Sequence, residues 1–216
     1  MARLPRLVVP GHAHYLIQRG HSGRTIFADE SDRRAYLDAL REAAAAQKVA
    51  VHAWALADSE VHLLLTPPAA DALARLMQAI GRRYVSAYHR RHGGSGTLWD
   101  GRFRAALVEP GATLLSALLL VDAAATATSA GHRTGESRDP LVVDPPEFWA
   151  LGNTPFEREA DYRTRLVQGL PEQQAQALRD AALGGWAQGS PGFIARLAEA
   201  VGRPLRPRAR GRPRRT

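Results

Sequence analysis

The first 130 residues alternate between two hydrophobic patterns. Apolar and polar positions that alternate with a period of two are typical of strands, and apolar positions spaced three and four apart are typical of helices. The patterns predict strands at residues 14–19, 49–57, 61–66 and 103–109, and helices at 29–47, 71–91 and 113–128. This order indicates the α+β fold class, in which helices pack on an antiparallel sheet.

Capping residues support two of the predicted helices, and an apolar stripe supports a third. Asp29 is a suitable N-cap for the first helix. A late helix at 190–202 begins with Ser190 as a cap and Pro191 at the first helical position. The helix at 71–91 has an apolar stripe that we interpret as core-facing, formed by Leu73, Leu76, Met77, Ile80, Tyr84 and Tyr88.

The changes in pattern predict four parts of the chain. Residues 1–130 form the α+β domain, and 131–147 read as a loop or linker because proline, glycine and polar residues replace periodicity. Residues 148–202 are predicted to be a helical C-terminal extension. Residues 203–216 are predicted to be a disordered, arginine-rich tail.

The composition of the chain limits the cellular compartments in which we expect the protein. The 216 residues contain no cysteine, which excludes disulfides and thiolate metal sites. The longest apolar run, at 114–127, is interrupted by Asp122 and is too short to span a bilayer. The first residues lack the apolar segment of a secretory leader. We therefore expect a cytoplasmic protein without a membrane partner.

The positive charge lies in two places. The net charge is +8, but the last fourteen residues hold seven arginines and no acid, so the rest of the chain has 22 basic and 21 acidic residues. A second basic cluster lies at 81–104, where arginines far outnumber the single acid, Asp100. Two separate basic clusters predict a polyanionic partner, although a solvated tail alone explains part of the charge.

The candidate chemistry is the sequence Glu60-Val61-His62 in the third predicted strand. Residues two apart in a strand point to the same face, so the carboxylate and the imidazole lie together. Both groups suit Mg²⁺ or Mn²⁺, which makes a weak two-ligand metal site one interpretation. A local hydrogen bond between Glu60 and His62 is the other. His12 and His14 form a histidine pair, which we interpret as surface or pairing residues.

Several segments together resemble a known family. They are HYLIQRG at 14–20, VHLLLTP at 61–67, GRRYVSAYHRRHGGSGTLWDGRFRAALVE at 81–109 and FIARLAEAVGRPLRPRARGRP at 193–213. The chain resembles the single-tyrosine HUH transposases of bacterial insertion sequences, in the branch of REP-associated tyrosine transposases. The resemblance extends over nearly the whole chain.

The resemblance implies a metal held by two histidines on one strand, and a tyrosine on a later helix that attacks a DNA phosphate. Here Glu60 stands where the first histidine is expected, and only His62 matches. Leu120 stands at or near the tyrosine position, and Ala124 near a further metal ligand. No tyrosine occurs between Tyr88 and Tyr162, so the expected nucleophile is absent in any register. The chain is therefore interpreted as a degenerate member.

Arginines are the predicted DNA ligands, because guanidinium groups bind phosphates in bidentate fashion. Trp99 and Phe103 could stack on bases or belong to the core. The expected nucleic-acid-binding residues are Arg82, Arg83, Arg102, Arg104, Arg206, Arg208, Arg210 and Arg212.

The function predicted from the sequence is a transposase-like protein that binds structured or single-stranded DNA, such as hairpins or repeat ends, without cutting it. Bound to DNA, it would lie with the nucleoid. One alternative is a metal-dependent single-strand nuclease or transposase with a substitute tyrosine such as Tyr84 or Tyr88. Another is a module that binds structured RNA. Monomeric and homodimeric states are both compatible with the sequence.

Overall fold

A six-stranded sheet forms the centre of the computed structural model, which describes residues 6–207. The strand order is β5-β2-β3-β1-β4-β6, and all neighbours are antiparallel except β4 and β6, which are parallel. The strands are β1 (His14–Arg19), β2 (Ala50–Leu56), β3 (Glu60–Thr66), β4 (Arg104–Val108), β5 (Ala127–Thr128) and β6 (Ala187–Gln188). The predicted α+β class is confirmed.

Helices connect and cover these strands. The α-helices are α1 (Glu30–Gln47), α2 (Ala72–His92), α3 (Ala112–Asp122), α4 (Ala130–Thr134), α5 (Pro146–Trp149), α6 (Pro155–Gln168), α7 (Glu172–Gly184) and α8 (Pro191–Val201), and a short 3₁₀ helix, η1, spans His21–Gly23. The predicted caps occur: the Asp29 carboxylate accepts from two backbone N–H groups of α1, and the Ser190 hydroxyl accepts from that of Phe193.

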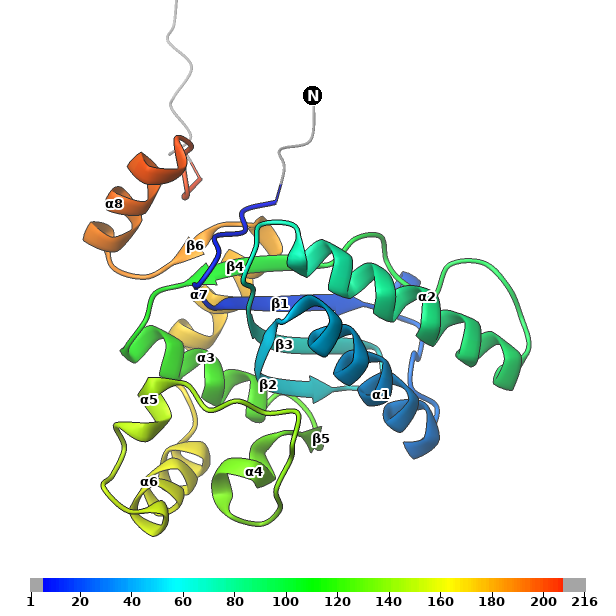
Figure 1. Ribbon diagram of the computed structural model, residues 1–216, viewed down its shortest axis with the longest axis horizontal. Helices are drawn as coiled ribbons and strands as arrows, with labels where there is room; N and C mark the ends of the chain where they lie inside the picture. The colour runs from blue at the N-terminus through cyan, green and yellow to red at the C-terminus, as the bar shows by residue number, and fades with distance from the viewer. Residues whose placement is uncertain (1–5, 208–216) are drawn as a thin grey trace, which may run out of the picture.

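The strands bury both faces under separate helical layers. Leu16 and Leu63 point toward α1 and α2, and Tyr15 and Leu64 point toward α3 and α7. Figure 1 shows α1 and α2 lying across one face of the sheet, with α3 at the other. Because both faces are covered, β1 and β3 have nearly continuous buried runs, as expected for central strands.

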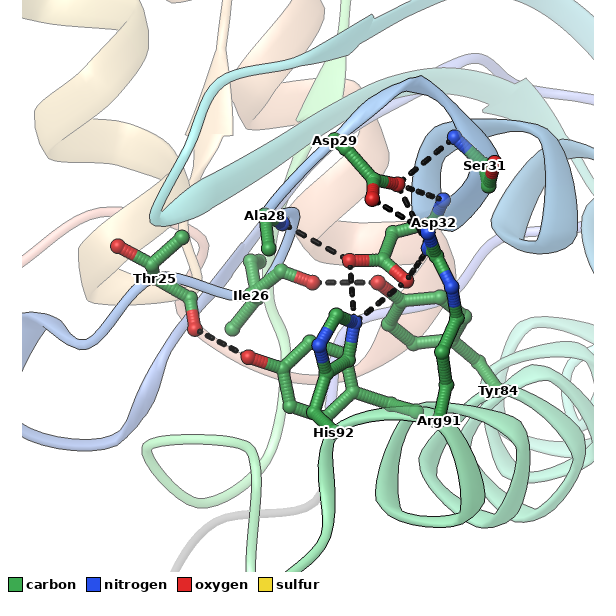
Figure 2. A network of polar contacts seen from close by, with 10 residues as sticks. Thr25, Ile26, Ala28, Asp29, Ser31, Asp32, Tyr84, Arg91 and His92 are labelled. Atoms are coloured by element: carbon green, nitrogen blue, oxygen red, sulfur yellow. Dashed lines mark hydrogen bonds and ion pairs between the residues drawn. The ribbon is translucent and has the colours of Figure 1, made fainter.

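A polar network locks the end of α2 to the start of α1 (Figure 2). Asp32 is buried and accepts hydrogen bonds from Arg91 at 2.8 Å and His92 at 2.9 Å, while Arg91 also pairs with Asp29. Burial acts to raise the pKa of Asp32, but these donors outweigh it, and the pKa lies below its ordinary value. Arg91 therefore has a structural role in joining the two helices. The network explains why α2 runs to His92.

The helix predicted at 113–128 is shorter than expected. It ends at Asp122, and the following residues turn back to form β5 against β2. The reason is Asp122 itself, whose buried carboxylate accepts hydrogen bonds from Ser129 and Tyr162, both at 2.6 Å. Ser129 can reach that carboxylate only if the chain leaves the helix. The aspartate that interrupts the apolar run is thus a polar anchor.

Arg133 completes this anchor and lies in the segment predicted as a loop or linker. Its side chain is fully buried between Asp122 at 3.2 Å and Asp144 at 3.0 Å, and it also donates to the carbonyl of His52. Residues 131–147 contain the end of α4, which begins at Ala130, and the start of α5. They are tied to the sheet by a bridge between Val51 and Val142.

The extension that follows also contributes to the sheet. It supplies β6, and α7 packs on β4 and β1. Residues 203–207, which belong to the predicted tail, include a contact with β6. Leu205 is buried, and its carbonyl accepts from the N–H of Ala187 at 3.0 Å. Arg208, Arg210 and Arg212 lie outside the described residues. The division of the chain into domains stays a prediction.

His14 gives the fold a titratable core group. Its Nδ1 contacts the carbonyl of His12 at 2.8 Å, and its Nε2 accepts from the N–H of Val9 at 3.2 Å, so the ring must be neutral. Burial lowers its pKa from 6.5 to about 4. Below pH 6.5, His14 therefore binds a proton in the unfolded chain but stays neutral in the folded chain. Stability falls as the pH drops from 6.5 toward 4.

We expect His14 to reduce the free energy of unfolding by about 2 kcal/mol between pH 6.5 and pH 5. Urea unfolding of the wild type and of His14→Gln at several pH values measures this. The difference between the two pH profiles isolates His14, because buried His52 titrates in both proteins. Parallel profiles would contradict the assignment.

The described residues include no helix long and apolar enough to cross a membrane.

Candidate nucleic-acid interface

Glu60 and His62 lie at the start of β3, in a chain of four polar side chains on the face toward α3 and α7. The Glu60 carboxylate accepts from Arg19 at 2.8 Å and lies 3.3 Å from Nε2 of His62. Nδ1 of His62 lies 2.8 Å from the hydroxyl of Tyr15. The local Glu60–His62 contact, one of the two interpretations of this pair, is therefore present.

The order of this chain fixes where the protons lie. Because a carboxylate only accepts, Nε2 of His62 carries the hydrogen toward Glu60, and in the neutral imidazole Nδ1 accepts from the Tyr15 hydroxyl. The hydrogen bond from His62 lowers the pKa of Glu60; burial opposes this, and Arg19 adds to it. Both ring nitrogens of His62 are engaged in these contacts, so no lone pair is left for a cation. The Glu60 carboxylate is already paired with Arg19. The donor set does not fit Mg²⁺ or Mn²⁺.

The part of the chain that the structure describes supplies no third ligand nearby. Among residues 6–207, no three His, Cys, Asp or Glu side chains form a group that could hold a metal ion. Ala124, the position considered for a further ligand, lies beyond the end of α3.

Leu120 lies at the same end of the sheet as this chain. Helix α3 follows β4 and runs back along the sheet, so its last residues reach the end where β3 and β4 begin. Leu120 is buried and lines a small cavity together with Ala123 and Arg179 of α7. Burial raises the pKa of Tyr15, and the charge of Arg179, which lines this cavity, acts against it. Leu120, at the position considered for the nucleophile, thus lies at the same end of the sheet as Glu60 and His62, which were considered as metal ligands.

Every tyrosine of the chain is buried. The chain has five, and none is more than 8% exposed: Tyr15, Tyr36, Tyr84, Tyr88 and Tyr162. The hydroxyls of Tyr84 and Tyr88 donate to the backbone carbonyls of Ile26 and Thr25 (Figure 2). Burial raises the pKa of Tyr84. These two tyrosines, considered as substitute nucleophiles, are core residues that a DNA phosphate cannot reach.

A cavity beside β4 gathers arginines from distant parts of the chain. Arg6, Arg102, Arg104 and Arg203 line it, around Phe103 and Trp186. Its volume is about 150 Å³. Arg102 and Arg104 are exposed and have no ion pair within residues 6–207. We call this the arginine cavity. Guanidinium groups concentrated around one cavity suit a phosphate-bearing ligand.

The register of the sheet connects the arginine cavity to Glu60 and His62. Ile17 of β1 pairs with His62 on one side and with Arg104 on the other. Directly paired residues point to the same face, so Arg104 lies two strands, about 10 Å, from His62. A ligand in the cavity would therefore lie next to the polar chain at the start of β3.

Sequence reasoning found half of this cavity. Arg102 and Arg104 were predicted from their local charge, whereas Arg6, Arg203 and Trp186 were missed because they come together only in the fold. Phe103 is buried, and the guanidinium of Arg6 lies over its ring, 3.9 Å from the centroid. Trp99 is buried between α1 and α2 and belongs to the core. Trp186 had no signal in the sequence pattern.

The other predicted arginines lie elsewhere. Arg82 and Arg83 are on the outer surface of α2, and Arg83 pairs with Glu42 of α1. Arg206 is exposed and donates to the carbonyl of Gly189 at 3.0 Å. The basic cluster predicted at 81–104 is therefore divided between two surfaces.

Comparison with known proteins gives a structural likeness. No protein-family model matches the chain, and no curated protein matches it. Among solved structures, a REP-associated tyrosine transposase bound to a REP hairpin superposes with a TM-score of 0.53 at 11% identity, covering 68% of this chain and 93% of the other. A Deinococcus radiodurans R1 protein described as a "putative transposase" gives a TM-score of 0.39 at 27% identity, covering 50% and 88%.

The first of these likenesses shows that the chain has a transposase-like fold. About a third of the chain lies outside that superposition.

Proposed function

We propose that this protein binds structured or single-stranded DNA through the arginine cavity and does not form the covalent tyrosine–DNA link of an active transposase. The fold supports a transposase-related role, and the neighbour with the same fold was solved with a REP hairpin bound. Arg102 and Arg104, which have no acidic partners within residues 6–207, are the proposed phosphate ligands.

The burial of all five tyrosines carries the proposal that no covalent link forms. A nucleophile must reach the phosphorus atom and must be activated by a nearby base or metal. Tyr15 has a base, His62, at 2.8 Å, in an order that resembles nucleophile, base and acid. Its side chain is fully buried, however, and burial raises its pKa. The arrangement supports a structural role for the Tyr15 hydroxyl.

The test separates binding from chemistry. The protein is incubated with a labelled hairpin DNA that has single-stranded flanks, with Mg²⁺ or Mn²⁺. We expect a shifted band on a native gel and none on a denaturing gel. A protease-sensitive adduct that survives denaturation and maps to a tyrosine would contradict the proposal, as would metal-dependent cleavage products.

A competition experiment at fixed salt tests the choice of nucleic acid. A labelled DNA hairpin is displaced by unlabelled DNA or RNA hairpins of the same sequence, because phosphate affinity depends steeply on salt. We expect DNA to compete at least as well as RNA. Stronger competition by RNA would favour the RNA-binding alternative.

A further inference from the structure

The outer surface of helices α1 and α2 carries a second basic region, distinct from the arginine cavity. Helix α2 has no aspartate or glutamate in 21 residues, whereas basic residues recur along it. Between the two helices lies an open groove of about 550 Å³, walled on the α2 side by Arg82, Arg83 and Arg90. The groove and the arginine cavity share no lining residue.

The arginines of the groove are arranged in a row. Arg82, Ser86 and Arg90 follow one another at intervals of four residues, so they lie on one face of α2 over about 12 Å. The Ser86 hydroxyl accepts from Arg90 at 2.8 Å and holds that guanidinium along the groove. Arg82 is exposed and has no ion pair within residues 6–207.

The floor of the groove is made of small side chains, so a ligand backbone can approach the helices closely. Its α1 side and floor are formed largely by alanines, of which Ala39, Ala43 and Ala46 come from α1 and Ala79 from α2. Methyl groups leave room for a bulky backbone to lie between the arginines. The one acid, Glu42, pairs with Arg83 at the rim and opposes an anionic ligand.

We infer that this groove is a second nucleic-acid site, which holds a phosphodiester backbone while the arginine cavity holds another. The inference rests on the proposed function, because the ligand class is the same. One chain would then join two segments of DNA. Arg83 and its partner Glu42 set the affinity of the groove, since the ion pair must open before Arg83 can contact a phosphate.

The test is a bridging experiment. A hairpin DNA is immobilised, the full-length protein is added, and retention of a second, fluorescent 20-base-pair duplex is measured. We expect retention by the wild type, a roughly tenfold loss in Arg82→Ala/Arg90→Ala, and a gain in Glu42→Gln. Binding of the first hairpin should change little in either variant. Arg34→Ala/Arg41→Ala, which removes two arginines of α1 outside the groove, should match the wild type.

Each outcome is informative. A wild type that binds the first hairpin but retains no duplex overturns the second site and leaves the proposed function standing. Undiminished bridging in Arg82→Ala/Arg90→Ala also overturns it, because two copies of the chain or another surface would then join the DNAs. Failure to bind the first hairpin would instead contradict the proposed function.

Discussion

Replacing Arg133 with methionine is expected to lower the free energy of unfolding by about 3–5 kcal/mol. The guanidinium is fully buried and pairs with Asp122, which is also fully buried, and with Asp144, which is partly buried. Burial raises the pKa of Asp122, and Arg133 is the strongest opposing influence. Without Arg133, both carboxylates lose the one arginine that they share, and each must stay charged in its buried setting or take up a proton. Either change costs much of the stability of a typical domain.

Chemical denaturation of the variant and the wild type measures this effect. Arg138→Met is the matched control, because Arg138 is exposed in the same segment and lies only five residues away. It should change stability by less than about 0.5 kcal/mol. If Arg133→Met and Arg138→Met lose similar stability, the buried network does not anchor residues 123–168 to the sheet.

Replacing Arg102 and Arg104 together with alanine is expected to weaken hairpin binding about 100-fold. Hydrogen bonds from a charged group contribute about 1.5–3 kcal/mol each, so two lost contacts amount to about 3 kcal/mol. The salt dependence should also become shallower by nearly one unit of slope for each lost phosphate contact. Fluorescence anisotropy with a labelled hairpin at several salt concentrations measures both quantities.

The control for this pair is again Arg34→Ala/Arg41→Ala, since both arginines are exposed and form ion pairs within α1. It removes the same charge from another surface and should weaken binding only slightly. Equal losses in the two double variants would mean that net charge, and not the arginine cavity, determines affinity. Thermal unfolding of each variant verifies that the fold is intact.

Local signals in the sequence predicted the fold well. The short segment HYLIQR, ended by Gly20, located β1 at its observed bounds, and the N-cap preference of aspartate located the start of α1 at Asp29. The polar contact of Glu60 with His62 could be considered because i and i+2 share a face of a strand. Such signals depend on residues close together in the chain.

What the sequence could not reveal depends on distant partners. Asp122, where α3 ends, takes its hydrogen-bond and ion-pair partners from Ser129, Arg133 and Tyr162, so the apolar pattern alone extends the helix too far. The arginine cavity joins Arg6 to Arg203 through the packing of β4 and α7. Conversely, Arg91 lies in the basic cluster predicted at 81–104 but pairs with Asp29 and Asp32. Charge density alone does not distinguish these cases.

Both outermost strands of the sheet, β5 and β6, are only two residues long. An edge strand exposes unpaired N–H and carbonyl groups that can recruit a strand from another molecule, and short edge strands limit this risk. Beyond β5, the outer side of β2 is further covered where the N–H of Val143 donates to the carbonyl of Val51 at 2.8 Å. Two copies of the chain could therefore not join their sheets into one without displacing β5 or β6. The short edges of the sheet thus limit the edge-to-edge pairing that leads to aggregation.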